Sequence, residues 1–120
     1  MSSIQTILNF QNEIRLHHWG TTSYSAHVAL GALYEGLDPL LDAFTESYIG
    51  VNGRKEVFQI NSMAFNGPKK TTAETVLKSF EEYLSQEMEK EQETNHTSLL
   101  NIRDEMLALV QKTRYLLTLS

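Results

Sequence analysis

Cysteine is absent from the 120 residues, which excludes disulfides, thiolate metal sites and cysteine nucleophiles. There are only two prolines, and no apolar run approaches the roughly 18 residues that a membrane-spanning helix needs. Residues 1–15 lack the basic start and continuous apolar stretch of a secretory signal. The lack of cysteine fits a reducing compartment, so we expect a cytoplasmic protein that does not act in a membrane.

Basic residues are scarce where a nucleic-acid-binding protein would need them. Arg15 is the only Lys or Arg in the first 50 residues, and the net charge is −5. Residues 81–93 alone carry six glutamates and one lysine. Neutralising phosphates with basic side chains supplies most of the affinity for nucleic acid. We therefore expect no nucleic-acid partner.

What the sequence does contain is apolar residues at helical spacing. With 41% apolar and 21% charged residues, it reads as one ordered domain over residues 1–120. Four segments have the spacing of amphipathic helices, near 3–19, 22–50, 71–92 and 96–118. Residues suited to cap the first three helices are Ser2 or Ser3, Thr22 or Ser23, and the capping box Thr71–Glu74.

The second segment carries two kinds of side chain on neighbouring faces. Its apolar stripe is Leu30, Tyr34, Leu37, Leu41, Phe44 and Tyr48, and beside it lie His27, Gly31, Glu35, Asp38, Asp42 and Glu46. At about 100° per residue, the second set spans an arc of about 100°. Pro39 allows a kinked continuous helix or a new helix capped by Asp38. Because the stripe keeps its phase across Pro39, we favour the kinked continuous helix.

A long connection over residues 50–71 separates the second and third helices. Its apolar residues predict a short helix or extended stretch packed over the core: Val57, Phe58, Ile60, Met63 and Phe65. Short turns within each helix pair and a long crossover between the pairs are the connectivity of ferritin-like bundles. We therefore predict an all-α fold, a ferritin-like four-helix bundle with a long crossover between helices 2 and 3.

Part of this sequence also resembles a known family. The pair His18–Trp19, followed by His27, Tyr34, Asp42 and Glu46 without a gap in the second helix, resembles the signature of Dps proteins, a branch of the ferritin-like superfamily. The layout also resembles small ferritin-like proteins of tailed phages, for which the location would be the host cytoplasm. The Dps resemblance implies an iron site at a two-fold subunit interface, with ferroxidase activity.

Three departures from the Dps pattern bear on this function. The connection from His18 to His27 is three residues shorter than in that family. Gly31 stands where another carboxylate ligand is usual, and the basic N-terminal tail used on DNA is absent. The first two lead us to expect weak or absent ferroxidase activity, with Glu35 as a substitute ligand.

The distance along the second helix determines how such a site could form. His27 and Asp42 are separated by about 22 Å at 1.5 Å per residue, so they cannot ligate one metal within a chain. Two antiparallel copies of this helix, related by a two-fold axis near Glu35, would bring His27 of one chain to Asp42 and Glu46 of the other. We therefore predict a homodimer at least, extendable to a larger shell. Its site of His18, His27, Asp42 and Glu46 suits iron, with manganese or zinc as alternatives.

Simpler interpretations stand beside this one. The acidic ridge can be a solvated helix face, and His18 a packed or capping histidine. His17 reads as exposed, and Trp19 as a core anchor rather than an aromatic beside the metal. The spacing Glu93–His96 matches one Glu-x-x-His motif of a di-iron centre, but it lies in an expected turn. The alternative function is a non-enzymatic helical assembly protein that kept the fold and lost the metal chemistry.

Overall fold

The computed structural model describes residues 2–88 and 96–119, and all regular structure in these ranges is helical. Its elements are α1 (Ser3–Gly20), α2 (Tyr24–Asn52), α3 (Lys55–Gln59), α4 (Ala73–Glu82), the π-helical turn η1 (Tyr83–Glu87) and α6 (Thr97–Leu117). The all-α prediction is confirmed. The predicted end of the third helix, residues 89–92, and the motif Glu93–His96 fall wholly or partly outside the described residues.

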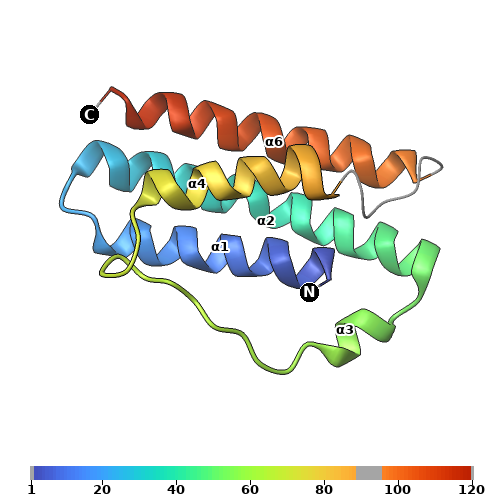
Figure 1. Cartoon of the computed structure of the whole chain (residues 1–120). Coiled ribbons are helices and arrows are strands. Elements are labelled where there is room, and N and C mark those ends of the chain that lie inside the picture. The colour runs from blue at the N-terminus through green and yellow to red at the C-terminus, as the bar shows by residue number, and fades with distance from the viewer. Residues whose placement is uncertain (1, 89–95, 120) are drawn as a thin grey trace.

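The long helices lie side by side along the length of the molecule (Figure 1). Helix α1 packs against α2 and α4, and α6 packs against the same two helices. Helices α1 and α6 run in one direction and α2 and α4 in the other (Figure 1). The connection that contains α3 returns along the outside, from the end of α2 to the start of α4. This arrangement leaves one long face of α2 without a helical neighbour in the described chain.

Side-chain caps fix where three helices begin. The hydroxyl of Ser2 accepts a hydrogen bond from the Gln5 amide, and that of Ser23 accepts one from Ala26. Both agree with the sequence prediction. Helix α4, the third of the predicted helices, is capped by Thr72, whose Oγ1 accepts a hydrogen bond from the Thr75 amide. The predicted capping box at Thr71 was therefore one residue too early.

Pro39 lies inside a single continuous helix, since α2 extends from Tyr24 to Asn52. The predicted continuity is confirmed, and the alternative of a new helix capped by Asp38 is wrong. Proline cannot donate the amide hydrogen bond, so one helical bond is lost at this point. The apolar stripe on both sides of Pro39 is buried, and its burial keeps the two halves in one helix.

The core lies between the four long helices and includes the predicted stripe of α2, of which Tyr34 is only partly buried. Its fully buried large side chains are Ile7, Ile14, Leu30, Leu37, Phe44, Leu77, Phe80, Leu84, Met88, Leu99, Met106 and Val110. In the connection, Val57 and Ile60 pack partly against this core. Phe58 and Phe65 are 77% and 40% exposed, so their predicted packing over the core is wrong.

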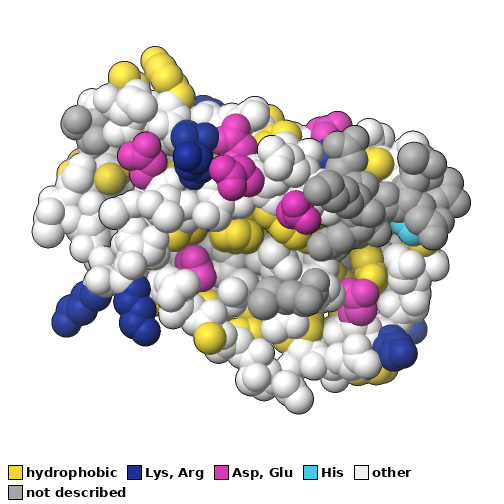
Figure 2. Space-filling model, in the orientation of Figure 1, with side chains coloured by type: hydrophobic (Ala, Val, Ile, Leu, Met, Phe, Trp, Pro, Cys, Tyr) yellow, Lys and Arg dark blue, Asp and Glu magenta, His cyan; other side chains and the backbone are white. Residues whose placement is uncertain are grey.

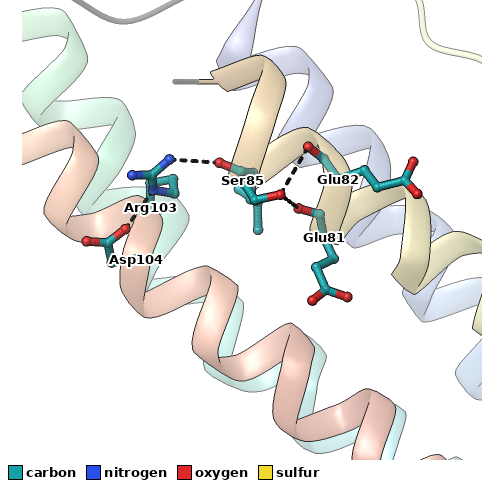
Figure 3. Close-up of polar contacts among 6 residues, drawn as sticks. Glu81, Glu82, Ser85, Arg103 and Asp104 are labelled. Carbon is teal, nitrogen blue, oxygen red and sulfur yellow. Dashed lines mark hydrogen bonds and ion pairs between the residues drawn. The ribbon is translucent and has the colours of Figure 1, made fainter. Parts of the chain in front are cut away.

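The turn that continues α4, η1, is wider than a turn of α-helix. The amide of Met88 donates to the carbonyl of Tyr83, five residues earlier, as in a π-helix. The guanidinium of Arg103 reaches across from α6 and donates to the Leu84 carbonyl at 2.9 Å, while its Nε pairs with Asp104 (Figure 3). Arg103 thus satisfies a backbone acceptor within the irregular turn.

In the view of Figure 2, acidic side chains gather over α4 and α6 with a basic group among them, and further basic side chains stand out at the lower edges. No helix among residues 2–88 and 96–119 is both long and apolar enough to cross a membrane.

Candidate metal centre

His18 and His27 form a reciprocal pair that joins the end of α1 to the start of α2. The Nδ1 atom of His18 lies 2.7 Å from the carbonyl oxygen of His27, and Nδ1 of His27 lies 2.8 Å from the carbonyl oxygen of His18. The two rings stack with centroids 3.9 Å apart and planes 12° from parallel. The prediction had placed both residues in one site, and the fold does bring them together.

These contacts determine which tautomer each imidazole ring adopts when it is neutral. A carbonyl oxygen only accepts hydrogen bonds, so each Nδ1 carries the hydrogen and donates it. The lone pair of each neutral imidazole therefore remains on Nε2. Histidines that bind metals usually donate their other ring N–H to a carbonyl or carboxylate in this way.

The pair also serves the backbone. The carbonyl of His18 lies in the last turn of α1, where carbonyls have no partner within the helix. The ring of His27 supplies that partner. Part of the reason for these two histidines is thus structural, because each ring closes the turn between the helices.

Gly31 makes room for this arrangement. A Cβ atom at Gly31 would lie 2.8 Å from Cε1 and 3.1 Å from Nδ1 of His18. The position at which the Dps pattern has a carboxylate is therefore filled by the ring of His18. The glycine follows from the close approach of α1 and α2, and a glutamate could not replace it without moving His18.

The predicted carboxylate ligands lie farther along the same helix. Asp42 and Glu46 are exposed, and the described residues give neither a hydrogen bond nor an ion pair. Asp38, on the same ridge, accepts a hydrogen bond from the buried amide of Gln11 at 3.0 Å. Glu35 lines a shallow depression together with His18, His27 and Gly31.

No three His, Asp or Glu side chains in the described part of the chain lie close enough to hold one metal ion. Within one chain, the histidine pair is therefore separate from Asp42 and Glu46.

Two neighbouring predictions were wrong. His17 was expected to be exposed, but it faces the core with 5% of its surface accessible, and burial lowers the pKa of its imidazole. Its Nε2 is buried and has no hydrogen-bond partner among the described residues. Trp19 was expected to anchor the core, but it is 67% exposed. Its ring centroid lies 5.9 Å from the guanidinium carbon of Arg15.

A polar groove between α1 and α4 was not predicted. Only 8% of the surface of Glu13 is exposed. This burial raises the pKa of the Glu13 carboxyl, although the carboxylate accepts a hydrogen bond from the Asn66 amide. The Oδ1 atom of Asn9 is buried without a partner. The available signal was the spacing of Thr6, Asn9 and Glu13 along one side of the first helix.

Comparison with protein-family models gives a match that covers most of the chain. A model described as a family of unknown function, DUF5856, matches residues 18–117. No curated protein and no solved structure matches the chain. The matched region begins at His18 and includes the histidine pair and the predicted carboxylate ligands Asp42 and Glu46.

Proposed function

The chain belongs to the DUF5856 family, and we propose that it is a ferritin-like, Dps-like protein that binds divalent metal, iron first, at a two-fold subunit interface. The observation that carries the proposal is the histidine pair, in which both Nδ1 atoms donate to carbonyls and both Nε2 lone pairs are left for a ligand. The order of helix contacts, with α1 and α6 each between α2 and α4, supports a ferritin-like four-helix bundle.

The orientation of the rings favours two metal ions. An imidazole binds a metal in its own plane, about 2.0–2.1 Å from the nitrogen for zinc. Because the planes of His18 and His27 are nearly parallel and the centroids are 3.9 Å apart, their lone pairs do not converge on one point. Each ring therefore serves a separate ion, and carboxylates that can bridge two ions complete the set.

Asp42 and Glu46 of a second copy are the carboxylates we assign to this role. They project from the exposed face of α2, and the described chain gives them no partner of their own. An antiparallel pairing of α2 about Glu35 brings them to the His18–His27 pair of the other copy. Bound Fe(II) would be open to oxidation there, and the absence of a ligand at Gly31 leads us to expect that oxidation is slow or absent.

The decisive experiment is metal titration of the whole chain with Fe(II) under anaerobic conditions, and with Mn(II) and Zn(II). We expect D42A/E46A to abolish binding while the helical circular dichroism is unchanged. The control is E82A/E105A, which removes two exposed carboxylates from α4 and α6. Absence of binding by the wild type, or unchanged binding by D42A/E46A, would refute the metal site.

A second candidate, an assembly protein without metal chemistry, is favoured by an apolar surface. Tyr24 and Val28 of α2 and Leu119 beyond α6 are 81%, 49% and 63% exposed, and they adjoin Ala32 and Leu116 in one shallow groove. A dimer that forms equally well with and without metal, in wild type and in D42A/E46A, and that binds no metal, would support this candidate.

A further inference from the structure

The groove between α1 and α4 lies away from the histidine pair and is lined mainly by polar side chains. Helix α1 contributes Thr6, Asn9, Phe10 and Glu13, helix α4 contributes Thr75, Val76 and Ser79, and the connection closes it with Asn66 and Thr71. The two helices pack side by side in Figure 1. The groove shares no lining residue with the depression at the histidine pair.

The groove contains two acceptors in need of a donor. Glu13 is buried, and its one hydrogen bond in the described chain is a long one, 3.4 Å, from the Asn66 amide. No Lys or Arg lines the groove, so this carboxyl has no cationic partner there. One turn earlier, Oδ1 of Asn9 is buried without a hydrogen bond. Side chains four residues apart on a helix have Cβ atoms about 5–6 Å apart, so a single donor group can reach both.

The walls of the groove fit an organic cation better than a metal ion. Phe10, which stacks on Phe80 with centroids 4.7 Å apart, and Val76 form an apolar wall. An aromatic ring also attracts an ammonium group through its π face. Calcium ions take six to eight oxygen ligands and magnesium keeps several waters, whereas this groove offers one carboxylate, and its other side-chain oxygens are uncharged amides and hydroxyls beside an apolar wall.

We propose that the α1–α4 groove binds a small primary ammonium compound, with the ammonium group between the Glu13 carboxylate and Asn9 Oδ1 and the alkyl part against Phe10 and Val76. Three hydrogens on the ammonium group match these two acceptors and a groove hydroxyl such as that of Thr75. Binding would hold Glu13 ionised, because the cation supplies the charge that the protein lacks at this point.

The test is a titration of the ¹⁵N-labelled full chain with ethylammonium chloride, followed by the backbone amide shifts of Asn9, Glu13, Asn66 and Thr75. Ethanol at equal concentration is the neutral control of similar size, and sodium chloride is the control for ionic strength. We expect saturable shifts confined to the groove with ethylammonium alone. Shifts with all three additives, or no saturation, would overturn the proposal.

Two isosteric variants sharpen the test. Because a hydrogen bond to a charged group is strong, E13Q should weaken ethylammonium binding about tenfold or more. N9D, which adds a second carboxylate at the unpartnered acceptor, should strengthen it. E105Q, on the exposed face of α6, removes the same charge as E13Q outside the groove and should leave binding unchanged.

Equal binding by wild type and E13Q, or weaker binding by N9D, would overturn the proposal. Calcium or magnesium chloride shifting the same amides to saturation while ethylammonium does not would do so as well. If E13Q fails to fold, N9D decides alone.

Discussion

The ring of His18 occupies the space that a side chain at position 31 would need, with Cε1 only 2.8 Å from a Cβ built on Gly31. The two residues come from different helices, so the contact sets how closely α1 and α2 approach. The same contact positions the His18 ring over His27, and it therefore ties one glycine to the geometry of the candidate metal centre.

We predict that G31A disturbs the histidine pair and destabilises the fold. Alanine in a helix normally stabilises relative to glycine, but overpacking against His18 should outweigh this and cost about 1–3 kcal/mol. Urea unfolding measures the change, and Zn(II) titration should show weaker binding.

The matched control for G31A is G50A, since Gly50 lies in the same helix with nothing within 4 Å of its Cβ position. It should stabilise by about 0.5–1 kcal/mol. If G31A were as stable as G50A and bound zinc as well as wild type does, the steric role of Gly31 would be wrong.

His17 should make the protein less stable in mild acid. Burial lowers the pKa of the folded imidazole from its ordinary value of 6.5, so the unfolded chain binds the proton more readily. Its contribution to stability is therefore present above about pH 6.5 and is lost as the pH falls through the lower folded pKa.

H17L removes both the titration and the unpartnered buried Nε2. We expect it to raise the free energy of unfolding by about 1 kcal/mol or more and to weaken its pH dependence between pH 5 and 7. Urea unfolding of both proteins at several pH values provides the comparison. An identical pH dependence in H17L would show that the proton is bound elsewhere.

Residues 17–19 show why the burial of individual side chains could not be predicted from the sequence, although the helices could. The caps at Ser2 and Ser23 and the stripe of α2 follow from local rules, so the helices were predictable. Which of three adjacent residues at the end of α1 faces the core depends on the helices that pack there. His17 took the core position and Trp19 the surface, against their usual hydrophobic order.

The site residues show the same division. The spacing of His18 and His27 marked them as candidates, but their reciprocal bonds depend on the path of the chain through residues 20–23, which sequence patterns do not give. The role of Gly31 likewise depends on a neighbour from another helix. Glu13 was missed because a single carboxylate among polar residues resembles an ordinary exposed one.

Arg103 should contribute more to stability than Arg114, although both arginines connect α6 to the segment formed by α4 and η1. Arg103 is 11% exposed and donates to the Leu84 carbonyl beside the π-helical turn. We expect R103M to cost about 1–3 kcal/mol, because it removes a charged donor from that acceptor.

Arg114 pairs with Glu81 nearer the surface, with 34% and 22% of the two side chains exposed. R114M, the matched variant, should cost less than about 1 kcal/mol. Thermal and urea unfolding rank the two variants, and an equal or larger loss in R114M would contradict the role assigned to Arg103.

Dimer formation through α2 and metal binding should depend on each other. If Asp42 and Glu46 of a second copy complete the centre, a variant that blocks the α2 pairing must lose metal while keeping all four proposed ligands. Val28 lies on the exposed face of α2, one residue after His27, and is 49% exposed. V28D places a buried charge in the proposed interface, so it should shift the protein to monomer in light scattering. We expect its metal affinity to fall about tenfold or more, in the range that loss of supporting ligand contacts costs at metal sites.

F58D is the control, since Phe58 is 77% exposed and lies on α3 rather than on the helix proposed to pair. It should leave both mass and metal binding unchanged. Dilution of the wild type through its dimer dissociation range should reproduce the loss of affinity by mass action. A monomeric V28D that binds metal as tightly as wild type would show that the site lies within one chain. Asp42 and Glu46 would then have no part in it, because one helix holds them about 22 Å and about 28 Å from His27.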